Sequence, residues 1–118
     1  VGLLSSKLPL ILDVYAEWCG PCKRIAPKVE ELARTYAGSV LFARLDGDDH
    51  DNEASQQLAA ALRVRAFPTF LAFEHGHNVP TERLQGANPA KLEELTRRLI
   101  NSPGPVPTAA AAGGAGGE

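Results

Sequence analysis

Cysteine is scarce in this 118-residue chain, which contains only two, Cys19 and Cys22. None is left over for the framework of several disulfides that small secreted domains usually carry. A zinc site is also disfavoured, because zinc needs four ligands and the other candidates are three histidines, His50, His75 and His77. We therefore expect neither a disulfide scaffold nor a metal site.

Long hydrophobic runs and clusters of basic residues are absent as well. No apolar stretch approaches the length that spans a bilayer, and no secretory signal is recognisable. The basic residues are scattered and the net charge is -2, so neither a membrane nor a nucleic acid is expected as a partner. The hydrophobic content of 44% is ordinary for a soluble globular protein. We expect an intracellular protein, in the cytoplasm or in an organelle.

The two ends of the chain carry separate expectations. The chain begins at Val1 rather than at a methionine, which we interpret as a processed product or a fragment with any targeting segment upstream. From residue 102 onward, a proline-rich stretch is followed by alanine and glycine repeats that cannot bury a core. The sequence thus predicts one folded domain over residues 1–101 and a disordered low-complexity tail over 102–118.

The two cysteines lie three positions apart, a spacing that allows one small disulfide to form and break. If a helix begins here, both thiols lie on its first turn, where free N–H groups and the macrodipole favour a thiolate. Cys19 at the amino end is then the expected nucleophile, and Pro21 suits an early helical position. The alternative is a structural disulfide, but a bridge across so few residues removes little entropy from the unfolded chain. Redox chemistry is therefore the leading hypothesis.

Hydrophobic periodicity predicts alternating strands and helices. A continuous apolar run from Leu8 to Tyr15 is typical of a strand buried on both faces, and later segments repeat apolar residues every three or four positions. The predicted order is a strand over 8–15, a helix over 19–36, a strand over 40–45, an acidic loop over 46–53, a helix over 54–62, a strand over 67–73, an antiparallel strand over 79–84 and a helix over 90–100. This order indicates an α/β fold with a central mixed sheet and helices on both faces.

Three features of the chain together resemble the thioredoxin family, over roughly residues 3–101. They are the run Leu12-Asp13-Val14-Tyr15-Ala16-Glu17-Trp18-Cys19-Gly20-Pro21-Cys22-Lys23, the helix proline Pro27, and Phe67-Pro68-Thr69. The resemblance implies a thioredoxin fold. Family members open with a strand and a helix before the central strand, whereas only residues 1–7 precede it here. The resemblance therefore also implies that the N-terminal strand is missing.

The resemblance assigns roles to the residues around the cysteines. Cys19 resembles the attacking thiolate, Cys22 resembles the resolving thiol, and Lys23 adds positive charge beside them. Asp13 resembles the buried carboxylate that exchanges a proton with Cys22, and an acid in an apolar strand is expected to have a raised pKa. The alternative for Asp13 is a hydrogen-bonded core acid with a structural role only.

Pro68 resembles the cis-proline that faces the disulfide in this family, where the backbone of Phe67 offers strand-like hydrogen bonds to an extended substrate. The alternative is a trans proline at a strand entrance. The resemblance also implies a mostly apolar rim on which partner proteins dock. We call this the docking rim, and it consists of Trp18, Gly20, Pro21, Ala66, Phe67, Gln85, Gly86 and Ala87. The alternative for Trp18 is packing alone.

Three positions depart from the family pattern. Tyr15 stands where many thioredoxins have a second tryptophan, and Arg44 stands where a lysine often lies near the buried acid. Because arginine stays charged when buried, the pKa of Asp13 is expected to be shifted differently. The loop from Asp46 to Glu53 is longer and more acidic than in compact members; it contacts a partner or is simply solvated. A calcium loop is disfavoured, since the required glycine and terminal glutamate are absent.

The resulting functional hypothesis is a protein disulfide reductase. The Cys19/Cys22 dithiol would reduce disulfides in partner proteins and maintain redox homeostasis, without a metal or organic cofactor, and a thioredoxin-reductase-type electron donor would recharge it. The alternative is a thioredoxin-like redox-sensing or docking subunit of a larger protein assembly, suggested by the short start, the acidic loop and the tail. An oxidase or isomerase of secretory compartments is less favoured, because Gly-Pro between the cysteines resembles the reducing members.

Overall fold

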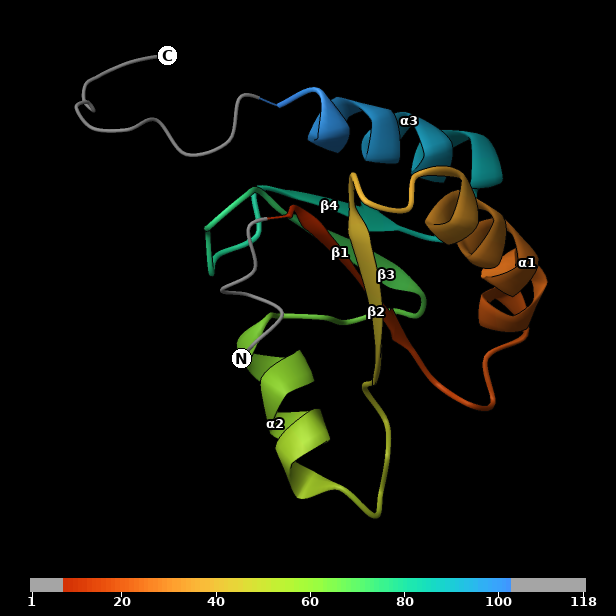
Figure 1. The fold of residues 1–118 in the computed structure, drawn as a ribbon. Helices are drawn as coiled ribbons and strands as arrows, with labels where there is room; N and C mark the ends of the chain where they lie inside the picture. Colours follow the sequence, from red (N-terminus) through yellow and green to blue (C-terminus); the bar gives the residue numbers. More distant parts are fainter. Residues whose placement is uncertain (1–7, 103–118) are drawn as a thin grey trace.

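The computed structural model describes residues 8–102, which form four strands and three helices (Figure 1). In chain order these are β1 (Leu10–Tyr15), α1 (Gly20–Thr35), β2 (Leu41–Asp46), α2 (Glu53–Ala61), β3 (Thr69–Phe73), β4 (Glu82–Gln85) and α3 (Pro89–Ile100). The succession of strands and helices agrees with the order that the sequence predicts.

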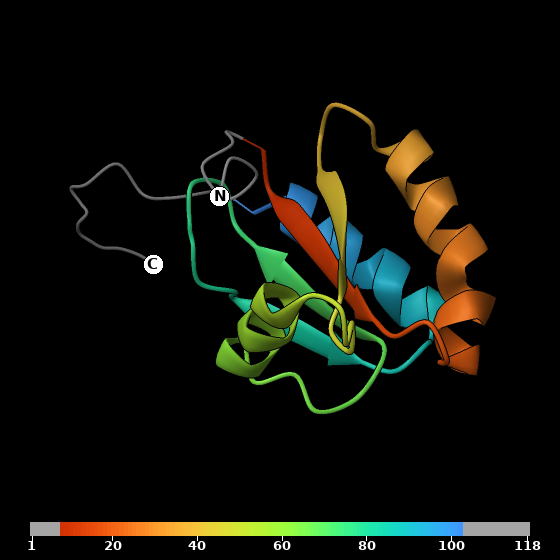
Figure 2. The same ribbon diagram turned by 90° about the horizontal axis from the view of Figure 1, so that it is seen from below.

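The four strands form one mixed sheet in the order β2-β1-β3-β4. β1 lies inside the sheet, where it pairs parallel to β2 and antiparallel to β3, and β4 pairs antiparallel to β3. α1 and α3 cover one face of the sheet and α2 covers the other (Figures 1 and 2). The predicted fold class, a central mixed sheet flanked by helices, is therefore confirmed.

Side chains along β1 alternate between two hydrophobic clusters. Ile11 packs with residues of α1 and α3, whereas Leu10 and Val14 pack with Ala59 of α2. Asp13 lies two positions after Ile11 and therefore faces α1, the helix that begins at the cysteine pair. The β1–β2 register places Arg44 directly beside Asp13, so both side chains leave the same face of the sheet.

The three helices begin at capping side chains of two kinds. Asn52 and Asn88 cap α2 and α3, and each side-chain oxygen accepts a backbone N–H of the first turn at 3.1 Å. The residue in the same position before α1 is Cys19, whose sulfur accepts the backbone N–H of Cys22 at 3.1 Å. The sequence therefore places a sulfur where the other two helices have an amide oxygen.

The observed strand bounds differ from the predicted ones by up to three residues, and β4 differs most. β4 covers residues 82–85 instead of 79–84, and pairing with β3 begins only where the backbone N–H of Thr81 donates to the carbonyl oxygen of Ala72 at 2.8 Å. Pro80 has no N–H to contribute to a sheet, and Val79 is 65% exposed. These two residues therefore belong to the loop.

Within residues 8–102, β2 is an edge strand. The predicted absence of an N-terminal strand concerns residues 1–7 and lies outside the described residues. The predicted tail, apart from Ser102, lies outside them too. The division into a domain over 1–101 and a tail over 102–118 therefore stays a prediction.

Candidate active site

Cys19 and Cys22 form a disulfide at the amino end of α1, with their Cα atoms 5.3 Å apart. Pro21 occupies the first turn, where no backbone N–H is needed from it. The sulfur of Cys19 already accepts one of the free N–H groups of this turn. After reduction, the same donors and the positive end of the helix macrodipole favour a thiolate on Cys19.

The disulfide is almost buried, since the two cysteines are only 2% and 4% exposed. They pack with Ala16, against the partly buried rings of Tyr15 and Phe67. A reaction partner must therefore contact the residues around Cys19 in order to reach its sulfur. The residues around the sulfur of Cys19 therefore control which molecules can react with it.

Trp18 is the most exposed large hydrophobic residue of this surface, at 69%. Its ring meets Phe67 edge to face, with ring centroids 5.8 Å apart and an interplanar angle of 81°. Its indole N–H donates to Oδ2 of Asp48 at 2.7 Å. This contact is a role of the acidic loop that its composition does not indicate. One of its carboxylates holds the tryptophan beside the disulfide.

Replacing Asp48 by alanine should free the Trp18 indole while leaving the fold intact. Because the hydrogen bond is exposed, the free energy of unfolding should fall by no more than about 1 kcal/mol. Trp18 fluorescence should show faster loss of anisotropy, because the ring keeps only its contact with Phe67. Asp49→Ala is the matched control, since the Asp49 carboxylate accepts from Asp51 within the loop. An equal change in both variants would contradict the assigned contact.

Asp13 is a buried carboxyl, 3% exposed. Its Oδ2 lies 3.4 Å from Nε of Arg44, and its Oδ1 has no hydrogen-bond partner within residues 8–102. Burial raises the pKa of Asp13 above its ordinary value, and the charge and hydrogen bonding of Arg44 only partly oppose this effect. The site therefore holds an acid that is hard to ionise and has an unsatisfied oxygen.

The guanidinium of Arg44 stacks on the ring of Tyr15, with Cζ 3.9 Å from the ring centroid. About half of the Arg44 side chain is exposed, so its charge is partly hydrated while Nε stays close to Asp13. Both residues depart from the family pattern. The structure brings the two departures into direct contact, as a fixed cation above the buried acid.

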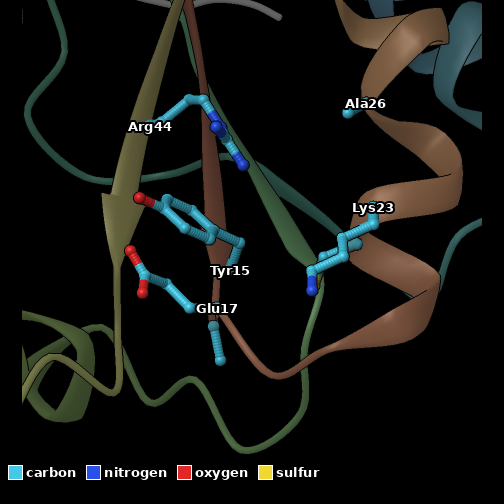
Figure 3. Close-up of a pocket in the computed structure, with 7 residues that line it drawn as sticks. Tyr15, Glu17, Lys23, Ala26 and Arg44 are labelled. Atoms are coloured by element: carbon cyan, nitrogen blue, oxygen red, sulfur yellow. The ribbon is translucent and has the colours of Figure 1, made fainter.

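An open cavity of about 530 Å³ lies between this cation and the start of α1. Figure 3 shows Arg44 and Tyr15 on one side of it and Lys23 on the other. The cavity is lined by Tyr15, Ala16, Glu17, Cys22, Lys23, Ala26 and Arg44. It reaches Cys22 and gives solvent a route toward the second cysteine.

The Phe67–Pro68 peptide bond is cis. The carbonyl oxygen of Pro68 accepts the backbone N–H of Gly86 at 2.9 Å, which joins the entrance of β3 to the end of β4. Gly86 has φ +98, a conformation that favours glycine. With the Trp18–Phe67 contact, this bond brings together the three segments of the docking rim, around residues 18–21, 66–68 and 85–87.

Other candidate sites are not found in the described part of the chain. His75 and His77 flank the turn after β3, and residues 8–102 contain no group of three or more potential metal ligands. No helix among these residues is long and apolar enough to cross a membrane.

Comparison with known proteins identifies related chains of similar fold and sequence. The chain is 40% identical over 84 residues to thioredoxin-1 of Schizosaccharomyces pombe, covering 71% of this chain and 74% of that protein. Mitochondrial thioredoxin 3 of Saccharomyces cerevisiae in its oxidised form superposes with a TM-score of 0.73 at 34% identity, covering 83% of this chain and 85% of that one. Fasciola hepatica thioredoxin gives a TM-score of 0.68 at 40% identity, covering 80% and 84%.

Some relatives are considerably longer than the matched segment. The chain spans 30% of thioredoxin-like protein 1 of Schizosaccharomyces pombe and 53% of chloroplastic thioredoxin X of Arabidopsis thaliana, at 43% and 37% identity. The sequence profile of the Thioredoxin family matches residues 2–98. With its paired cysteines at the start of α1, the chain belongs to the thioredoxin family.

Proposed function

We propose that this chain is a protein disulfide reductase in which Cys19 attacks the disulfide of a partner protein. The observation that carries the proposal is the position of the Cys19 sulfur, which caps α1 and accepts the N–H of Cys22 beside an exposed tryptophan. A thiolate held in this way is both stabilised and reachable for a docked disulfide.

The proposed reaction has two exchanges. The Cys19 thiolate attacks one substrate sulfur, forming a mixed disulfide and releasing the other substrate sulfur as a thiolate. Cys22 then attacks the Cys19 sulfur, which closes the Cys19–Cys22 disulfide and releases the second substrate sulfur. Two electrons pass from the protein dithiol to the substrate, and each released thiolate takes up a proton.

We assign to Asp13 the removal of the proton from Cys22 before the second exchange. Asp13 faces α1, its pKa is raised by burial, and one oxygen is free to accept. Arg44 contacts Asp13, and both Arg44 and Cys22 line the cavity. Solvent in the cavity therefore lies beside Cys22 and beside the residue that pairs with Asp13. Lys23 adds a second positive charge at the wall of the cavity, near the developing thiolate.

The docking rim is proposed to bind the polypeptide around the substrate disulfide. Trp18 offers an exposed apolar surface, and Phe67 lies immediately before Pro68, where an extended chain can pair with its backbone. Ala66 and Gln85 are exposed on the neighbouring segments. The bound disulfide would then lie over Cys19.

The electron donor, the substrates and the compartment are proposals of the same kind. We infer that a thioredoxin-reductase-type enzyme recharges the disulfide and that the chain contributes to redox homeostasis. The related chains support this, and one solved structure concerns thiol resolution in a yeast mitochondrial peroxiredoxin via glutathione/thioredoxin systems. The location is the cytoplasm or an organelle, and relatives described as chloroplastic and mitochondrial support the organelle.

A second candidate function is a redox-sensing or docking unit within a larger assembly. It is favoured by thioredoxin-like protein 1 of Schizosaccharomyces pombe, of which this chain spans only 30%. Purification of the native protein from its source under mild conditions separates the candidates. A stoichiometric complex that survives reduction supports the assembly unit, and a free monomer supports the reductase.

The proposed function is tested by reduction of insulin with dithiothreitol as the electron source. The protein should increase the rate of insulin reduction at micromolar concentration, well above dithiothreitol alone, because the docked disulfide reacts with a preformed thiolate. The double variant Cys19→Ser, Cys22→Ser is the control and should give the background rate. A wild-type rate equal to that background would reject the reductase.

A further inference from the structure

α2 ends in a turn of a type that usually contains glycine, although no glycine is present here. The backbone N–H of Arg63 donates to the carbonyl of Ala60, and that of Val64 donates to the carbonyl of Ala59, both at 3.0 Å. This is the Schellman pattern, in which the residue after the cap takes a left-handed conformation and is usually glycine. Here it is Arg63, with φ +61. The turn is therefore held in a conformation that its own residue disfavours.

Arg83 of β4 supplies a contact that stabilises this turn. Its guanidinium donates to the carbonyl oxygen of Leu62 at 2.7 Å and to that of Arg63 at 3.1 Å. Leu84 packs in the core beside α1 and α3, so Arg83, one position earlier, points to the opposite face, where α2 lies. A cation at the carbonyl end of a helix is also favoured by the macrodipole.

The segment fixed by this contact leads directly to the docking rim. Three residues separate Arg63 from Phe67. Two contacts fix the backbone at the end of this segment that leads into β3. The hydroxyl of Thr69 donates to the carbonyl of Ala66 at 2.7 Å, and the carbonyl of Pro68 accepts from Gly86. The left-handed turn at Arg63 sets the direction in which the segment begins.

We propose that Arg83 is a positioning residue for substrate docking. It holds the left-handed turn at Arg63, and the turn places Ala66 and Phe67 on the rim. Arg83 also lies two residues before Gln85, so one side chain couples the two rim segments that come from β4 and from the α2–β3 connection. The inference rests on the proposed function, because it assumes that protein disulfides dock on this rim.

The test compares insulin with a small disulfide that needs no docking. In Arg83→Met, which keeps the length of the side chain but removes the donors, KM for insulin should rise about fivefold to tenfold, with kcat within twofold of wild type. The rate constant of the reduced protein with 2,2′-dithiodipyridine and the redox potential should be unchanged, because neither depends on the rim. Equal losses with insulin and the small disulfide would overturn the proposal, as they would indicate general damage.

Two further variants make the outcome specific. Arg98→Met removes an arginine that pairs with Glu82 on the other face of β4 and should leave KM unchanged. Adding Arg63→Gly to Arg83→Met should restore KM to within twofold of wild type, since glycine adopts the left-handed turn without help. An Arg98→Met variant equal to Arg83→Met, or no recovery with Arg63→Gly, would contradict the positioning role.

A readout without catalysis separates this inference from the proposed function. Hydrogen exchange of the amides of residues 63–67 should be faster in Arg83→Met than in wild type or Arg98→Met. If wild type fails to reduce insulin, the reductase proposal fails. The exchange result still tests whether Arg83 holds the turn at Arg63. If wild type is active and both exchange and KM are unchanged in Arg83→Met, the reductase stands and the positioning role of Arg83 is wrong.

Discussion

A Cys22→Ser variant should accumulate as a covalent complex with a disulfide substrate, whereas Cys19→Ser should form none. When Cys22 cannot attack, the mixed disulfide on Cys19 has no intramolecular route to resolution. Cys19 caps α1 beside the docking rim, while Cys22 lies one turn further along the helix and lines the cavity. Turnover with insulin should fall on the order of 10³-fold or more in either variant, because the two thiols act as a unit.

The complex is measured by intact mass after mixing reduced variant with insulin and blocking free thiols. Cys22→Ser should give the summed mass, and excess dithiothreitol should abolish it. Far-ultraviolet circular dichroism against reduced wild type controls for folding. A stable complex formed by Cys19→Ser instead would show that Cys22 is the attacking thiol and reverse the assignment.

Replacing Asp13 with asparagine should stabilise the fold at pH 7 while slowing the reaction. Burial raises the pKa of Asp13, so the folded state binds its proton more tightly than the unfolded state does. The wild-type protein therefore loses stability as pH rises from the ordinary carboxyl range through the raised folded value. The cost is fully present once the pH exceeds the raised folded pKa, and a neutral amide of similar shape avoids it.

The expected gain in the free energy of unfolding is about 1–3 kcal/mol at pH 7, the scale for relieving a buried carboxylate that is incompletely paired. The gain should vanish below the ordinary carboxyl pKa, where Asp13 is protonated in both states. Urea unfolding of the two proteins in the same redox state at several pH values measures it. A constant difference at all pH values would mean that packing, and not ionisation, separates them.

The same substitution tests the proposed proton transfer. Without a carboxylate to accept the proton of Cys22, release of the mixed disulfide should slow on the order of 10²-fold near neutral pH. The first attack by Cys19 should be little affected, because its thiolate is stabilised by the start of α1. Rapid-quench kinetics resolve the two exchanges. If both were unchanged, Asp13 would be a core acid with a structural role only.

Much of the site's location could be predicted from local sequence. The cysteine spacing, with Pro21 between the two cysteines, indicates a helix start, and α1 does begin there. Alternation along the apolar run that contains Asp13 is a local signal too. The alternation of a strand fixes the side of the sheet on which the carboxyl lies.

The contacts between distant segments could not be predicted in this way. The Trp18–Asp48 hydrogen bond joins residues 30 positions apart, whereas the composition of the acidic loop indicates only a solvated or partner-binding segment. Arg63 gives no local sign of a left-handed turn, because arginine rarely adopts one and the stabilising Arg83 lies 20 residues later. Such features depend on packing between elements, which local periodicity and spacing do not encode.

An equilibrium redox titration tests the central claim, a reducing dithiol, most directly. The purified chain is equilibrated in dithiothreitol or glutathione buffers while the fluorescence of Trp18, the only tryptophan, reports the state of the adjacent disulfide. The account predicts a reversible two-electron transition at about -270 mV, the value typical of thioredoxins and well below that of disulfide isomerases. A potential of about -180 mV or higher would contradict it by indicating an isomerase or oxidant, as would the absence of any reversible transition.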